Sequence, residues 1–139
     1  MSRITYNADS LKIMFLFEKT TRIRLKDFFV DDNNLTSFVV AKEDLGKAIG
    51  KNASNVKKLE SLLKKKVRMI GFTESEVEFT KNLVHPLKVQ VEFKEGVITL
   101  KSDDTKTKAF LIGRNQSNIK NNLTIIRKYF KHVQDLKVN

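Results

Sequence analysis

Hydrophobic and polar positions follow two periods along this 139-residue chain, and the same order of periods occurs twice. In the first half, a helical apolar pattern precedes two segments with the period of two that is typical of half-buried strands. Two more helical patterns and a strand-like run follow. The pattern predicts a helix at 10–17, strands at 22–28 and 35–41, helices at 44–49 and 54–65, and a strand at 66–72.

The second half predicts the same order of elements. Pro86 ends its first helix, because the residue before a proline avoids the helical region, and 31–34 and 94–96 carry the turn residues of two hairpins. Each half therefore reads αββααβ, and the fold class is α+β with two domains, 1–73 and 74–139. The predicted elements of the second half are a helix at 74–85, strands at 88–93 and 97–100, helices at 105–112 and 117–131, and a strand at 133–138.

Helical spacing also predicts which side chains face the interior. The first helix is apolar on a broad face, and the helices at 54–65 and 117–131 carry apolar residues three or four positions apart. The predicted interior residues are Leu11, Met14, Phe15 and Leu16 in the first helix, Val56, Leu59, Leu62 and Leu63 in the second, and Ile119, Leu123, Ile126 and Phe130 in the third.

The positive charge of the chain is concentrated in two segments. The formal net charge is +11. Residues 42–68 carry 9 Lys and Arg against 3 acids, residues 101–131 carry 8 against 2, and the remainder has a net charge of −1. Two basic segments on a nearly neutral frame favour a polyanionic partner, nucleic acid above all, over a charge that serves solubility alone.

Each basic segment contains one copy of a repeated motif. Residues 49–57 read Ile-Gly-Lys-Asn-Ala-Ser-Asn-Val-Lys, and residues 112–120 read Ile-Gly-Arg-Asn-Gln-Ser-Asn-Ile-Lys. Six of the nine positions are identical at a constant offset of 63. The repeat indicates two copies of one structural unit.

An Ile-Gly-x-x-x-x-Asn-[Val/Ile] motif between two helices of an αββααβ unit resembles the KH domain in its type II arrangement. Two such units in tandem are similar to the archaeal NusA-like transcription factors, and 45–60 is the most specific stretch. The resemblance implies that each unit has a three-stranded sheet with helices packed on one face. It also implies binding of single-stranded RNA and a role in transcription elongation, termination or antitermination.

The family's loop reads Gly-x-x-Gly, and the second glycine is absent from both copies. Ala53 stands at that position in the first copy and Gln116 in the second. Alanine adds only a methyl group, whereas glutamine places a longer side chain where glycine leaves the backbone free to adopt positive φ. We therefore expect the first loop to bind RNA better than the second, unless the Gln116 amide itself bonds a phosphate or a base.

The resemblance implies that the loops hold about four nucleotides by contact with the RNA backbone, because amides at a helix N-terminus favour anions. Ser54 and Ser117 are the predicted N-cap residues of the helices that follow the loops. Asn55 and Asn118 are predicted to hold the loops by local hydrogen bonds. The candidate RNA-binding residues are Lys47, Ile49, Gly50, Lys51, Asn52, Ala53, Ser54, Lys57 and Lys58 in the first copy, and Lys108, Ile112, Gly113, Arg114, Asn115, Gln116, Ser117 and Lys120 in the second.

Two features of these candidates leave alternatives open. Ile49 and Ile112, with the returning hairpin strands at 39–41 and 97–100, fit an apolar floor for bases and simple packing equally well. The missing glycines also fit a second function, in which RNA binding is weakened and the chain is a protein adaptor that docks on RNA polymerase or the ribosome.

Catalysis has little support in the sequence. The chain has no Cys, and its two His residues lack the spacing of metal ligands. The acidic pairs Asp31-Asp32 and Asp103-Asp104 follow strands and are predicted to be turn and capping residues. We therefore predict no enzyme activity, no metal and no cofactor.

The expected partners are single-stranded RNA and, through the resemblance, RNA polymerase. The longest apolar run near the N-terminus, 13–17, is five residues long, which is far below the ~20 residues that span a bilayer. The sequence thus predicts a cytoplasmic monomer without a membrane segment.

Overall fold

The computed structural model describes residues 7–31 and 34–139, and the chain forms two compact units that divide between Phe72 and Thr73. Both units have mixed α+β structure with a three-stranded sheet, as the sequence predicts. We propose that the units correspond to domains 1–73 and 74–139. Within the described residues, no helix combines the length and the apolarity that crossing a membrane requires.

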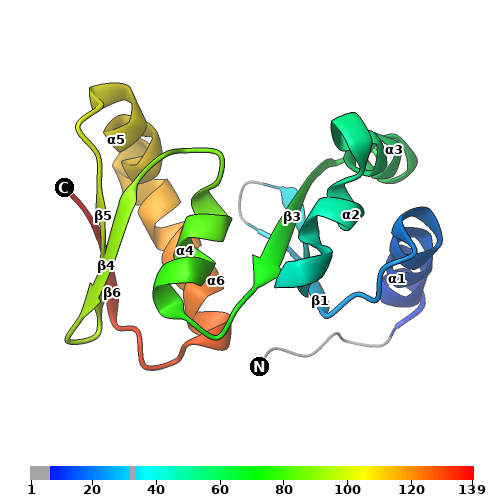
Figure 1. The fold of residues 1–139 in the computed structure, drawn as a ribbon, viewed down its shortest axis with the longest axis horizontal. Helices are drawn as coiled ribbons and strands as arrows, with labels where there is room; N and C mark the ends of the chain where they lie inside the picture. Colours follow the sequence, from blue (N-terminus) through cyan, green and yellow to red (C-terminus); the bar gives the residue numbers. More distant parts are fainter. Residues whose placement is uncertain (1–6, 32–33) are drawn as a thin grey trace. The chain divides into compact units, whose positions relative to one another are not determined.

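The first unit begins with a helix and a β-hairpin, continues through two helices and ends with a strand. Strand β2 is central: it pairs antiparallel with β1 and parallel with β3. The three helices lie on one side of this sheet (Figure 1). The elements are α1 (Ala8–Thr21), β1 (Asp27–Val30), β2 (Leu35–Ala41), a 3-10 turn η1 (Lys42–Asp44), α2 (Leu45–Ile49), a 3-10 turn η2 (Lys51–Ala53), α3 (Ser54–Leu63) and β3 (Lys66–Phe72).

The second unit repeats this order, with β5 as its central strand between antiparallel β4 and parallel β6. Its helices again cover one side of the sheet (Figure 1). The predicted αββααβ order is therefore confirmed in both halves. The elements are α4 (Glu76–Val84), β4 (Gln90–Lys94), β5 (Val97–Lys101), α5 (Thr105–Ile112), a 3-10 turn η3 (Arg114–Gln116), α6 (Ser117–Tyr129) and β6 (Asp135–Val138).

The first strand starts later than the predicted 22–28. Residues 22–26 alternate between exposed and buried side chains as expected, but the sheet ladder begins at Asp27. Arg22 ends α1 in the left-handed region with φ 61°, and the Leu25 amide donates to the Glu18 carboxylate at 3.0 Å. The segment is thus tied to the preceding helix before it reaches the sheet.

The predicted turn at 31–34 is visible at its two ends. The side chain of Asp31 accepts a hydrogen bond from the Leu35 amide at 3.2 Å, and Asn34 has a φ of 58°. Both features are typical of Asx residues in turns. Asp32 and Asn33, which share this prediction, lie outside the described residues.

The interior of the first unit is built around two stacked aromatic rings. Phe17 and Phe38 are both 0% exposed, with ring centroids 4.6 Å apart. Three residues that were predicted to face the interior do not do so. Leu11, Phe15 and Leu62 are 51%, 63% and 48% exposed, so that prediction was wrong for them. The inward face of α1 follows the spacing from Ile13 to Phe17 and Thr21, and Leu11 and Phe15 lie beside that face. The buried cluster comprises Phe17, Ile23, Leu25, Phe38, Val40, Ala48, Leu59, Val67 and Met69.

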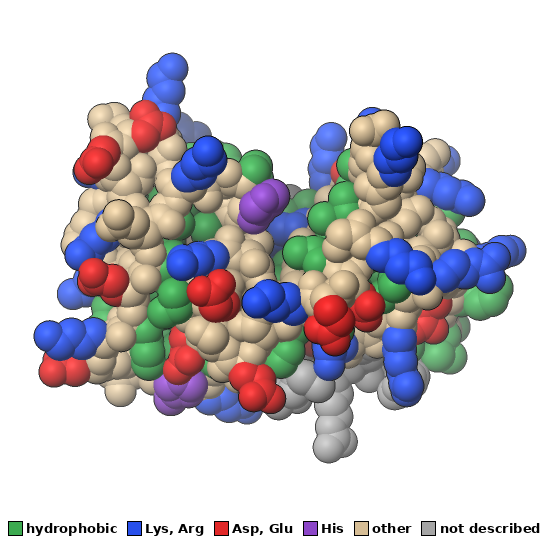
Figure 2. All heavy atoms as spheres, in the orientation of Figure 1, with side chains coloured by type: hydrophobic (Ala, Val, Ile, Leu, Met, Phe, Trp, Pro, Cys, Tyr) green, Lys and Arg blue, Asp and Glu red, His purple; other side chains and the backbone are tan. Residues whose placement is uncertain are grey.

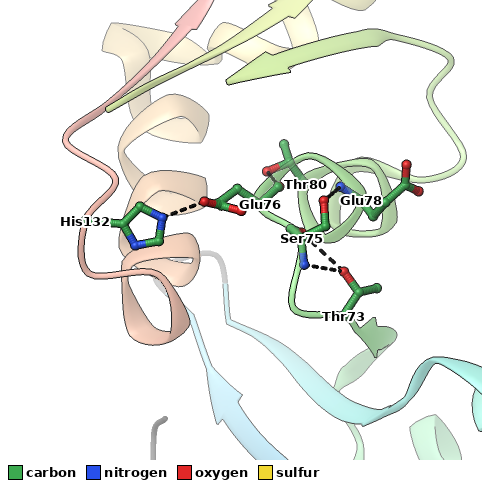
Figure 3. Close-up of polar contacts among 6 residues, drawn as sticks. All are labelled: Thr73, Ser75, Glu76, Glu78, Thr80 and His132. Carbon is green, nitrogen blue, oxygen red and sulfur yellow. Dashed lines mark hydrogen bonds and ion pairs between the residues drawn. The ribbon is translucent and has the colours of Figure 1, made fainter. Parts of the chain in front are cut away.

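The second unit has Phe79 at its centre, which the sequence pattern did not single out. Its ring is 0% exposed and lies 5.4 Å from the rings of both Tyr129 and Phe130. The helix that carries it begins with a side-chain cap: Ser75 Oγ accepts from the Glu78 amide at 3.3 Å. The Thr73 hydroxyl in turn accepts from the Ser75 amide at 3.0 Å (Figure 3). These bonds fix the start of α4 directly after the division between the units.

A polar contact ties the start of α4 to the segment after α6. His132 Nε2 lies 2.6 Å from Glu76 Oε2 (Figure 3). The hydrogen bond with His132 is the main reason why the pKa of Glu76 is lowered from its usual value of 4.5.

We expect the free energy of unfolding to fall less steeply with decreasing pH in Glu76→Gln than in the wild type. Because the pKa of Glu76 is lowered in the folded protein, its contribution is present above pH 4.5 and is lost as the pH falls through the folded pKa. Partial exposure limits the effect to about 0.5 kcal/mol. The measurement is urea unfolding at a series of pH values from about pH 6 to about pH 3, which covers the range in which this contribution is lost. Glu78→Gln is the control, and equal slopes for the wild type and Glu76→Gln would contradict the expectation.

Candidate nucleic-acid interface

Two loops of nearly identical backbone conformation join α2 to α3 and α5 to α6. Each starts with a glycine of positive φ, continues with a basic residue and ends with two residues in the left-handed region, and corresponding angles agree within about 10°. The φ and ψ values are 81° and 166° at Gly50, 56° and 32° at Asn52, 58° and 30° at Ala53, 73° and 172° at Gly113, 54° and 34° at Asn115, and 63° and 22° at Gln116.

The two residues that stand at the second glycine position have the same backbone conformation. Ala53 and Gln116 both adopt the positive φ that glycine would adopt freely, at a cost of about 1–2 kcal/mol for each residue with a Cβ. The expected difference between the two loops therefore depends on the side chain of Gln116, not on backbone conformation. The ranking of the loops stays a prediction.

The N-cap prediction was wrong in both copies. Ser54 and Ser117 are the first helical residues, with φ of −60° and −59°. The caps are Ala53 and Gln116, and neither makes a side-chain capping bond. The left-handed pair in each loop moves the helix start by one residue relative to the sequence signal. Both helix N-termini are therefore left without a side-chain cap, which suits the approach of an external anion.

The asparagine prediction is confirmed by two equivalent bonds. Asn55 Nδ2 donates to the Lys47 carbonyl at 3.2 Å, and Asn118 Nδ2 donates to the Phe110 carbonyl at 2.6 Å. Each bond links the helix after the loop to the helix before it. The asparagines thus hold the two ends of the loop together.

Most of the candidate side chains reach the surface beside these loops. Figure 2 shows Lys and Arg side chains gathered over the α2–α3 part of the first unit. Half-buried candidates are Ile49, Gly50, Ala53, Lys108, Ile112 and Gly113. Exposed candidates are Lys47, Lys51, Asn52, Ser54, Lys57, Lys58, Arg114, Asn115, Gln116, Ser117 and Lys120.

The strand part of the predicted apolar floor is only partly accessible, since Ala41, Val97 and Thr99 are half-buried. Val40, Ile98 and Leu100 are each 0% exposed, because they point into the interior of their units. Ile49 is half-buried and packs against the core cluster of the first unit. The packing interpretation is therefore favoured for this isoleucine.

Asp104 caps the helix that leads into the second loop. Its carboxylate accepts hydrogen bonds from the Thr107 hydroxyl at 2.6 Å and the Thr107 amide at 3.1 Å. The Thr107 side chain is the main cause of the lowered pKa of Asp104. The capping role predicted for the pair Asp103-Asp104 is thus confirmed for its second member.

Sequence reasoning missed one residue beside the second loop. Phe110 is 65% exposed, the largest value among the exposed large hydrophobic residues of the described chain. The offset of 63 aligns it with Lys47, which was a candidate. That alignment was the available signal, because periodicity alone gives no reason to separate Phe110 from interior residues.

Comparison with known proteins places this geometry in a family. A family model described as "KH domain" matches residues 13–96, and the chain belongs to this family. Curated relatives refine the assignment: three archaeal proteins that are each called "Probable transcription termination protein NusA" are similar to it. The chain is thus a NusA-like KH-domain protein.

The extent of these similarities differs. The Methanococcus vannielii protein is 35% identical over 63% of this chain, and the match spans half of that protein's length. The Methanocaldococcus jannaschii protein is 24% identical over 94% of this chain and 73% of its own length, and the Halococcus morrhuae protein is 29% identical over 70% of each. The crystal structure of APE1850 matches 96% of this chain and 100% of its own with a TM-score of 0.72 at 23% identity, which supports the fold.

Proposed function

We propose that the protein binds single-stranded RNA through the loops 50–53 and 113–116 and acts as a NusA-like factor in transcription elongation, termination or antitermination. The observation that carries the proposal is the repetition of one loop conformation at two uncapped helix N-termini, each inside a basic segment. Membership of the KH-domain family and the names of the curated relatives support it.

Each loop has the parts that a phosphate requires. The glycine at its start leaves room for close approach of the RNA backbone, and α3 or α6 presents the positive end of its helix dipole. The first amide of each helix, at Ser54 or Ser117, is bonded within the loop to the Lys51 or Arg114 carbonyl. Lys51 and Arg114 are exposed within the loops and supply a positive charge to the same phosphate. This arrangement binds the backbone of a strand without reading its sequence.

A second candidate function is docking on RNA polymerase or the ribosome. Leu11 and Phe15 are 51% and 63% exposed and lie one turn apart on α1, where two apolar side chains form a small surface for a protein partner. This surface is formed by a different element from the loops, so loss of RNA binding would leave it intact.

Binding of the intact protein to short single-stranded RNAs across a salt series tests the first proposal. We expect micromolar or tighter binding, with the logarithm of the association constant falling linearly with the logarithm of the salt concentration. Double-stranded RNA and single-stranded DNA of the same length are the competitors. Absence of binding to single-stranded RNA at moderate salt would refute the proposal and favour the adaptor function.

The two loops are expected to contribute unequally. Lys51→Ala should weaken RNA binding more than Arg114→Ala, because Gln116 places a long side chain at the end of the second loop where the first has only a methyl group. The expected loss at Lys51 is about tenfold, equivalent to one charge-assisted phosphate contact. Lys94→Ala, in the β4–β5 turn region, is the control. An equal or larger loss at Arg114 would reverse the ranking.

A further inference from the structure

Phe110 stands out in the second unit because it is both aromatic and exposed. Its neighbour Leu111 is 2% exposed and supplies the packing of α5 against the interior, whereas Phe110 is 65% exposed. An exposed phenylalanine forgoes the favourable free energy of removing its ring from water. Its side chain is therefore available to a ligand.

The position of Phe110 is fixed relative to the second loop. Its carbonyl accepts the 2.6 Å hydrogen bond from Asn118 on α6, and the Gly113 amide bonds the carbonyl of Ala109, the preceding residue, at 2.9 Å. Gly113 is the C-cap of α5, three residues after Phe110. Their separation along the helix axis is about 4.5 Å, which is within the reach of a single nucleotide.

The segment that follows Asp104, the N-cap of α5, carries charged side chains of one sign. Residues 105–134 contain no Asp or Glu, and Lys106, Lys108, Arg114 and Lys120 lie between Thr105 and the second turn of α6. Lys106 precedes Phe110 by four positions and shares its helix face. An aromatic ring flanked by cations and by a phosphate-binding loop complements a nucleobase that carries its own phosphate.

We propose that Phe110 is a stacking platform for an unpaired nucleobase of the strand whose phosphate lies at the loop 113–116. This inference rests on the proposed function and adds a base contact to it. The platform belongs to the second copy alone, since the first has Lys47 at the equivalent position. The two copies then hold RNA differently: the first by charge and backbone contact, the second also by stacking, which compensates for the long Gln116 side chain.

Equilibrium binding of the intact protein to a 12-nucleotide single-stranded RNA tests the platform. We expect Phe110→Ala to weaken binding by about 5- to 150-fold, the range that follows from removing one base–aromatic stack. Phe110→Trp should retain the affinity and Phe110→Leu should not. The slope of affinity against salt should stay unchanged, because the ring carries no charge. Phe15→Ala, which removes an equally exposed phenylalanine from α1, is the matched control.

A second readout locates the base. 2-Aminopurine placed at successive positions of the RNA should be quenched at one position by the wild type and at none by Phe110→Ala. If Phe110→Ala or Phe110→Leu binds RNA with wild-type affinity, the platform is overturned. If the same variant also keeps the salt dependence of the wild type, the proposed function remains supported. Absence of RNA binding by the wild type would overturn both. Thermal unfolding of each variant verifies that this exposed substitution changes stability by less than about 0.5 kcal/mol.

Discussion

Replacement of Gly113 by alanine is expected to lower the free energy of unfolding by about 2–4 kcal/mol and to abolish RNA binding at the second loop. Gly113 has φ 73° and ψ 172°, a region that is essentially restricted to glycine, where strain costs about 1–3 kcal/mol. An added Cβ would lie 2.8 Å from both the backbone nitrogen of Asn118 and the hydroxyl oxygen of Ser117. Asn118 yields little, because its side chain is bonded to the Phe110 carbonyl.

The same substitution at Gly50 is expected to have a smaller effect. Its Cβ would meet the Ser54 hydroxyl at 2.7 Å, which can rotate away, and the Asn55 amide nitrogen at 3.1 Å. Gly46 provides the control four residues earlier in α2, because nothing lies within 4 Å of its added Cβ. Gly46→Ala should raise helix stability by up to about 1 kcal/mol.

Urea unfolding of these three variants gives the comparison directly. The expected order of stability is Gly46→Ala above the wild type, then Gly50→Ala, then Gly113→Ala. A loss below about 0.5 kcal/mol at both loop glycines, which is typical of an unconstrained surface position, would show that the loop relaxes around a side chain and that glycine is not required there.

The combined reversal Lys51→Glu and Arg114→Glu is expected to weaken binding of single-stranded RNA by about 100-fold. Each change removes one cation from a loop and places a carboxylate beside the phosphate. The combined loss corresponds to about 2.8 kcal/mol, and the larger share is expected from the first loop. The two losses should add, because the loops are on separate units. Because the variant no longer neutralises two of the phosphates, the salt slope should fall by about 1.4.

The control for this variant must carry the same net charge. Lys94→Glu and Lys137→Glu together change the charge equally, at exposed positions at the ends of β4 and β6. Figure 1 shows the β4–β5 hairpin at the opposite end of the second unit from α5. If the control loses as much affinity as the loop variant, the overall charge and not the loops determines binding.

The sequence predicted the limits of helices and strands best where strong local signals mark their ends. Strands β2 and β3 and helix α5 have the predicted limits. For α5 the reason is that Asp104 caps its start and Gly113 ends it. The interior of α1 was harder to predict, since five consecutive residues from Ile13 to Phe17 are apolar and periodicity cannot select one face among them. Tertiary packing makes that choice, burying Phe17 and exposing Phe15.

The candidate loops were found from the repeat, but their detailed geometry was not. Ser54 and Ser117 have the composition of N-caps, yet the left-handed conformation of the preceding residue displaces the cap. No propensity indicates that Ala53 and Gln116 adopt positive φ, because both residues disfavour it. The loop ends and their asparagine bonds impose that conformation. The exposure of Phe110 likewise depends on how α5 packs, which its own sequence does not reveal.

The parallel pairing of β2 with β3, and of β5 with β6, has a thermodynamic consequence. Parallel strands require a crossover connection, and here each crossover is the helix–loop–helix segment that carries the candidate site. A loop therefore cannot lose its shape independently of the segment that closes its sheet. Occupation of a loop by RNA is linked to the folding of its whole unit, and at a ligand concentration 100 times Kd this linkage stabilises the unit by about 2.7 kcal/mol.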